Sequence, residues 1–157
     1  MTGANHSSTP TSTSATDSFN AADVTFVTGM IPHHTQAVAM SDTLLKKNWN
    51  RPTVAALAVK FKGEQASEIT KMTGWLRSWK VPTSTASSMF GMDMGTGTGM
   101  MSDADMSALD SASGLTASKL FLTQMIQHHV GAIGMATTEN KARRNSDSPH
   151  PCHRHHQ

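Results

Sequence analysis

The chain has 157 residues, a formal net charge of +2 and a single cysteine, Cys152. This length allows one modest domain, and one cysteine excludes an internal disulfide framework and a cysteine-based zinc site. Residues 1–140 contain 9 Lys or Arg and 10 Asp or Glu, so the positive charge comes from the last 17 residues. We therefore expect no nucleic-acid partner, and the lack of an apolar run of 18 residues predicts no membrane span.

The N-terminal part of the chain predicts a leader and then a long helix. Residues 1–19 are rich in Ser and Thr with few apolar residues, which predicts a disordered leader. They have neither the charged nor the apolar region of a secretory signal peptide. Asn20 and Asp23 predict a helix N-terminus, and apolar residues at helical spacing continue the helix over 21–47. Pro32 lies inside it, where a kink is expected.

A second helix is expected from Pro52 to about Trp79, because apolar residues keep the helical period after a proline at its start. Its sequence places Gln65, Glu68 and Met72 near one face. Two interpretations of Glu68 stay open. Its carboxylate could accept a hydrogen bond from a ligand histidine and fix its tautomer, or it could be solvated and paired with a neighbouring lysine, Lys60 or Lys71.

The rest of the chain predicts a loop, a short helix and a last long helix. Residues 83–101 contain mainly Gly, Ser, Thr and Met without an apolar period, which is typical of a loop. Ser102 and Asp105 predict the start of a short helix with Gly114 as its stop. Thr116 is expected to cap a helix over about 117–140. The helical domain is thus assigned to 20–140, followed by an irregular, basic, His-rich tail over 141–157.

An internal repeat is the most informative feature of the chain. Residues 26–40 and 121–135 share Phe, Thr, Met, Ile, a His-His pair, Ala and Met at one constant offset. Such a repeat predicts two similar helices that face each other, each with Met, His, Ala and Met along one stripe. The candidate metal ligands on these helices are Met30, His33, His34, Met40, Met125, His128, His129 and Met135.

The donor types in the repeat favour copper. Thioether and imidazole together suit Cu(I), and imidazole also suits Cu(II) or zinc; helical bundles build metal sites from side chains on facing helices. The alternative is that each His and Met only packs in the core. The loop adds further thioethers, either as a copper collector or as drift in a tolerant segment, at Met92, Met94, Met100 and Met101. The tail could bind metals loosely through His150, Cys152, His153, His155 and His156.

Several phrases occur in the order found in a known family. They are Met-Ile-Pro-His-His-x-x-Ala-x-x-Met, Gln-x-x-Glu-Ile-x-x-Met-x-x-Trp-Leu, Gly-Met-Met-Ser and Met-Ile-x-His-His-x-Gly-Ala-Ile-x-Met-Ala. Over about residues 20–140 the chain resembles the domain-of-unknown-function 305 family. The resemblance implies a ferritin-like helical bundle, a periplasmic or extracellular location and, from CopM-like members, copper binding and tolerance. It assigns the repeat residues above, loop Met100 and Met101, and the supporting residues Gln65, Glu68 and Met72 to the site.

The C-terminus departs from the family pattern, which usually closes with a second Gln-x-x-Glu-Ile-x-x-Met helix. We therefore expect an all-α, ferritin-like antiparallel bundle whose last helix is missing, with an exposed apolar face that could drive homo-oligomerisation.

The expected function is non-enzymatic sequestration of copper, as Cu(I), Cu(II) or both. Two alternatives stay open: a bundle-bound copper or iron oxidoreductase, and a helical interaction protein without metal. The lack of a Glu-x-x-His phrase disfavours a diiron carboxylate site.

Overall fold

The structure is a computed structural model that describes residues 19–48, 51–82 and 97–147. The described residues form helices and loops and contain no strand, which confirms the predicted all-α class. No helix among them is long and apolar enough to cross a membrane. The helices are α1 (Ala21–Leu45), α2 (Pro52–Ser78), α4 (Asp103–Ser111) and α5 (Gly114–Asp147).

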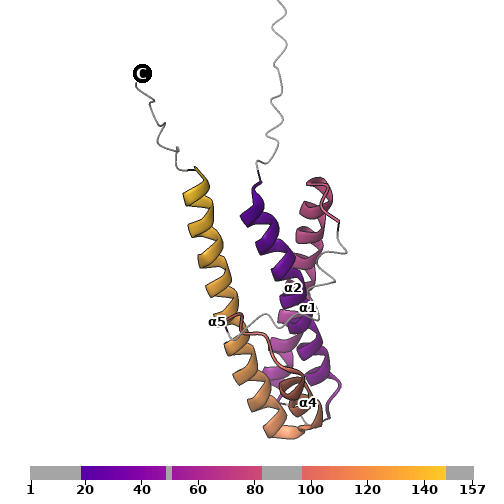
Figure 1. Ribbon diagram of the computed structural model, residues 1–157. Helices are drawn as coiled ribbons and strands as arrows, with labels where there is room; N and C mark the ends of the chain where they lie inside the picture. The colour runs from indigo at the N-terminus through magenta and orange to yellow at the C-terminus, as the bar shows by residue number, and fades with distance from the viewer. Residues whose placement is uncertain (1–18, 49–50, 83–96, 148–157) are drawn as a thin grey trace, which may run out of the picture.

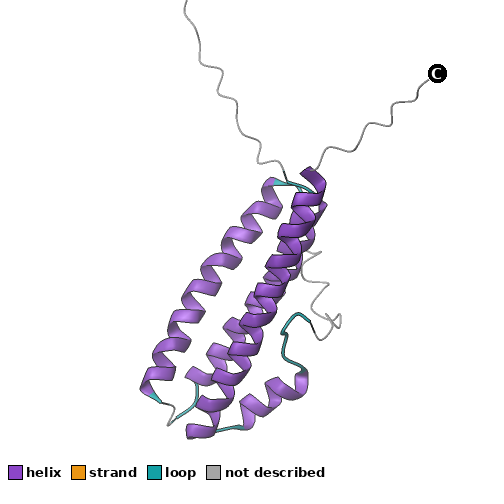
Figure 2. Ribbon diagram, turned by 90° about the vertical axis from the view of Figure 1, so that its left-hand side faces the viewer, coloured by secondary structure: helices purple, strands orange, loops and turns teal. Residues whose placement is uncertain are grey.

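The three long helices form a bundle in which α1 lies between α2 and α5 (Figure 1). Both α2 and α5 run antiparallel to α1. The short helix α4 packs against α1 and α5 at the lower end of the bundle. Figure 2 shows the same arrangement from the side. The two helices that carry the repeat, α1 and α5, are thus neighbours, as the repeat predicted.

Two helix starts are fixed by reciprocal capping, as the sequence indicated. The Asp23 backbone N–H donates to the Asn20 side chain (3.0 Å), and the Asn20 backbone N–H donates to the Asp23 carboxylate (2.8 Å). Ser102 and Asp105 form the same capping box before α4. Each box satisfies two backbone groups that a helix start would leave unpaired.

The apolar residues form two core clusters, one on each side of the repeat histidines along the bundle axis. The upper core is built from α1 and α2 and contains Val27, Met30, Met72 and Leu76. The lower core joins α1, α2, α4 and α5 and contains Ala37, Met40, Leu44, Ala58, Met101, Leu109, Ala117, Phe121 and Met125. The predicted stripe on α1 is therefore buried along its whole length.

The structure corrects the expected bounds of the last helix. Gly114 has φ +57 and begins α5, whereas Ala112 is the C-cap of α4. Thr116 is thus not a cap. At the other end α5 continues to Asp147, seven residues past the predicted end, because Arg143 pairs with Asp23 (3.4 Å) and Glu139 (3.8 Å). The predicted leader, most of the methionine-rich loop and the end of the tail lie outside the described residues.

Candidate metal centre

The centre of the bundle holds two closely apposed imidazoles, one from each copy of the repeat. The rings of His33 on α1 and His128 on α5 have centroids 3.6 Å apart and an interplanar angle of 34°. Their side chains are almost inaccessible, with relative exposures of 2 % and 0 %. We call these two residues the His pair. The two residues occupy the same position in the two copies of the repeat. They meet because α1 and α5 run antiparallel and cross at this point.

Burial keeps both rings of the His pair uncharged. It is the main reason that the pKa of His33 is lowered to about 4. The hydrogen bond to the Thr98 carbonyl raises this pKa, whereas the charges of His34 and His129 lower it further. Burial likewise lowers the pKa of His128 to about 3, with the neighbouring His33 as the next cause. At neutral pH each ring is a neutral imidazole with one nitrogen lone pair available, the form that binds metals.

The His pair leaves most of its ring nitrogens without a hydrogen-bond partner among the described residues. His33 Nε2–H donates to the Thr98 carbonyl (3.0 Å), but His33 Nδ1 and both nitrogens of His128 have no partner. A buried polar atom without a partner costs about 1–3 kcal/mol. Three such atoms in one place are unusual in a folded protein and require an explanation such as a bound ion.

Methionines surround the His pair on both sides along the bundle axis. Met30 and Met72 are buried in the upper core, against which Met135 packs. Met40, Met101 and Met125 are buried in the lower core. Met101 is therefore a core residue and not part of an exposed collector. Met100 is partly buried, and Met92 and Met94 lie outside the described residues.

The second histidine of each copy lies apart from the His pair and has its own partner. His34 Nε2–H donates to the exposed Glu68 carboxylate on α2 at 2.6 Å. Glu68 thus pairs with a histidine, and its predicted support of a metal ligand stays a prediction. Lys60 pairs instead with Glu64. His129 Nδ1–H donates to the Met125 carbonyl (2.7 Å), and its ring lies 5.0 Å from that of Phe61. Among the supporting residues, the Gln65 Oε1 atom is buried without a partner.

The structure gathers only a few of the predicted ligands at one point. The described residues contain no group of three or more His, Cys, Asp or Glu side chains that could hold a metal ion. An ion at the His pair would thus have two imidazoles and would need thioether sulfur to complete its coordination. Two imidazoles alone suit several transition metals, and thioether sulfur beside them would shift the preference to the soft ion Cu(I). The pair lacks the third nitrogen, oxygen or thiolate ligand usual for zinc.

A family comparison identifies the sequence class. Residues 23–151 match the family described as Domain of unknown function (DUF305). The chain belongs to the DUF305 family. This confirms the resemblance inferred from the ordered His-His and Gln-x-x-Glu phrases. A search of curated proteins finds no match to this DUF305 chain.

Two solved structures share this fold. A presumed secreted DUF305 protein from Streptomyces coelicolor is 30 % identical, with a TM-score of 0.63 over 79 % of this chain and 80 % of that one. A DUF305 fragment from Deinococcus radiodurans is 24 % identical, with a TM-score of 0.62 over 80 % of this chain and 93 % of that one. The second likeness shows the fold alone.

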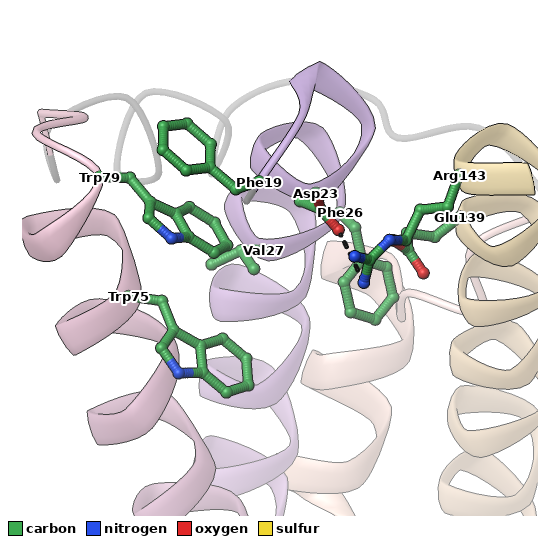
Figure 3. Close-up of a pocket in the computed structure, with 8 residues that line it drawn as sticks. All are labelled: Phe19, Asp23, Phe26, Val27, Trp75, Trp79, Glu139 and Arg143. Atoms are coloured by element: carbon green, nitrogen blue, oxygen red, sulfur yellow. Dashed lines mark ion pairs between the residues drawn. The ribbon is translucent and has the colours of Figure 1, made fainter. Parts of the chain in front are cut away.

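The DUF305 chain also has an open pocket of about 500 Å³ at the upper end, which sequence reasoning missed (Figure 3). Burial raises the pKa of Glu139, as do a hydrogen bond and the charge of Asp23 beside it. Arg143 pairs with both carboxyl groups. The spacing of Glu139 and Arg143 was a usable signal, since opposite charges four residues apart stabilise a helix. The other lining residues are Phe19, Phe26, Val27, Trp75 and Trp79.

Proposed function

We propose that this protein is a non-enzymatic copper-binding protein that holds Cu(I) at the His pair. The observation that supports the proposal is the burial of two neutral imidazoles with three unpartnered ring nitrogens at the point where the repeated helices cross. His33 and His128 would supply nitrogen ligands. The nearby methionines, which flank the pair along the bundle axis, would supply thioether sulfur.

Two considerations favour Cu(I) over other ions, and a third favours storage. Thioether and neutral imidazole are ligands that suit Cu(I), and the site is short of the hard oxygen donors that magnesium or calcium would need. A buried site excludes water and large chelators, which suits storage of an ion rather than turnover of a substrate. When bound, copper would be held in a closed, apolar environment. Sequestration is therefore the role that the surroundings of the pair support.

The test is the Cu(I) affinity of a variant that lacks both imidazoles. We expect His33→Leu combined with His128→Leu to weaken Cu(I) binding by at least about 100-fold, because even residues that only support metal ligands change affinity by about 10–100-fold. Leucine keeps the positions apolar and buried. Competition with a chromophoric Cu(I) chelator under anaerobic conditions measures the affinity, and circular dichroism checks that the helices persist.

The control concerns the histidines of the tail, which could bind metals independently. Replacing His150, His153, His155 and His156 by Ala, together with Cys152 by Ser, in the full chain should leave the tightest Cu(I) site unchanged. If removal of the tail histidines abolishes tight binding while the His pair variant keeps it, the proposal is wrong. An unchanged affinity in the His pair variant overturns it equally.

We also propose that the protein acts outside the cytoplasm, in the periplasm or the extracellular space. The support is the family relationship to the Streptomyces coelicolor DUF305 protein, which is a presumed secreted protein. Fractionation of cells that express the complete gene, with detection of this chain, distinguishes an exported protein from a cytoplasmic one.

The exposed apolar face of α5 supports self-association as a further part of the proposal. Ile126, Val130 and Ile133 lie along one face of the helix with relative exposures of 66 %, 63 % and 67 %. The repeat makes Ile126 the counterpart of Ile31, which packs against the upper core beside α2. In a ferritin-like bundle a fourth long helix would cover this face. A second copy related by a two-fold axis would bring its own α5 antiparallel to this one, and could cover the face.

Self-association is tested by making this face polar. We expect the wild-type protein to sediment as a dimer and the variant with Ile126→Gln and Ile133→Gln to sediment as a monomer, because the change removes apolar area that a partner would bury. Val59→Gln, at an exposed position of α2, is the matched control and should remain dimeric. A monomeric wild-type protein at all concentrations would exclude this interface.

A further inference from the structure

A short segment crosses the junction of α1 and α5 beside the His pair. We call residues 97–101 the strap. Its backbone passes so close to α5 that a Cβ atom on Gly131 would overlap the Thr98 carbonyl and the Gly99 nitrogen. Gly99 has φ +70, in the left-handed region that favours glycine. The crossing therefore depends on glycine in the strap and on glycine in α5.

The strap is also attached to α1. The Gln36 amide donates to the Met101 carbonyl (2.9 Å), and the Met101 backbone N–H donates to the Gln36 Oε1 atom (2.7 Å). The Met101 side chain is buried in the lower core. These contacts hold the backbone on the C-terminal side of Thr98. They place the Thr98 carbonyl 3.0 Å from His33 Nε2.

This contact determines where the hydrogen of His33 is located. A carbonyl oxygen can only accept, so the bond requires the hydrogen on Nε2. A neutral ring that carries its hydrogen on Nε2 has its lone pair on Nδ1, and that Nδ1 atom is buried without a partner. Histidines that bind metals commonly donate their other ring N–H to a carbonyl or carboxylate, which fixes tautomer and ring orientation.

We propose that the strap is a positioning element that fixes the tautomer of His33 through the Thr98 carbonyl, so that Nδ1 is the nitrogen presented to the metal. Gly131 allows the strap to lie close enough to His33 for this contact. The choice of Nδ1 as ligand rests on the proposed copper function. The tautomer and its dependence on Gly131 do not, since both are properties of the metal-free protein.

The first test observes the tautomer directly. Nitrogen-15 NMR of the metal-free protein should show His33 with its hydrogen on Nε2 and an unprotonated Nδ1. Addition of Ag(I), a diamagnetic substitute for Cu(I), should then shift the Nδ1 resonance of His33 most strongly. A hydrogen on Nδ1 in the metal-free protein, or a metal shift at Nε2, overturns the inference. If no metal binds at all, the proposed function fails while the tautomer result still stands.

The second test displaces the strap. Gly131→Ala should yield a mixture of His33 tautomers and a Cu(I) affinity about 10-fold weaker, the lower end of the range for residues that support a ligand. Gly134→Ala is the matched control on the same helix, because its added Cβ would have its nearest neighbour, the Gly97 carbonyl oxygen, at 3.9 Å. It should change neither quantity. Should Gly131→Ala fail to fold, Gln36→Leu removes two strap attachments instead. Variants that all keep the wild-type tautomer overturn the role of the strap.

Discussion

Acidification of the metal-free protein from pH 7 to about pH 4 is expected to unfold it. His33 and His128 have folded-state pKa values of about 4 and about 3, below the ordinary value of 6.5. Below pH 6.5 these two histidines therefore bind protons in the unfolded chain but not in the folded chain. The free energy of unfolding decreases as the pH falls through this range. The two shifts are not independent, because the charge of His33 contributes to the shift of His128. Since one pKa unit corresponds to about 1.4 kcal/mol, even one of these shifts is a substantial part of the stability of a typical domain, about 5–15 kcal/mol.

The helical circular dichroism signal, recorded between pH 8 and pH 3, measures this transition. The variant with His33→Leu and His128→Leu is the control, since it has no imidazole to protonate in the core. Its unfolding should move to lower pH, where the carboxylates are protonated. Coincident acid transitions in the two proteins would show that the His pair does not limit stability in acid.

Replacement of Phe121 by Ala is expected to destabilise the fold by about 3–5 kcal/mol, the range for loss of a buried aromatic side chain. Phe121 has a relative exposure of 0 % and is the largest of the fully buried side chains. It belongs to the lower core, which joins α1, α2, α4 and α5, and its ring lies 6.5 Å from that of Phe61 on α2. Its loss would leave a cavity at the place where the helices converge.

Urea unfolding at neutral pH measures this change, and Val59→Ala is the comparison. Val59 is exposed on α2, so its truncation should alter the free energy of unfolding by no more than about 0.5 kcal/mol. A loss as small for Phe121→Ala as for Val59→Ala would mean that the lower core tolerates the cavity by collapsing around it.

The repeat carried most of what could be predicted about the site. Because helical period and a constant offset are visible in sequence, they were enough to predict that His33 and His128 lie on facing helices. The helical spacing placed His33 and His34 on adjacent stripes, and likewise His128 and His129, but it could not show which stripe faces the partner helix. That distinction depends on the rotation of each helix about its axis, which tertiary packing sets. The capping pairs of Asn20 and Ser102 were predictable because they are local.

Contacts between distant segments were not predictable. The Thr98 carbonyl reaches His33 only because the strap crosses α5 at Gly131, and nothing in the composition of the loop indicates that crossing. The extension of α5 past Asn140 was missed for a different reason. The sequence there has no apolar period, and the helix continues through the charge pairs of Arg143, which an apolar pattern does not detect.

His33 and His128 are 95 positions apart in the sequence and come from different helices. Under the proposed function, this separation would link the copper supply to the lifetime of the protein. An unfolded chain cannot hold both rings at one ion without closing a long loop, so an ion bound at the proposed site stabilises only the folded form. Free Cu(I) at 100 times its dissociation constant would add about 2.7 kcal/mol. If the proposed function holds, proteases that cleave the unfolded form would remove the empty protein and spare the loaded one, so that the abundance of the protein would follow the copper supply.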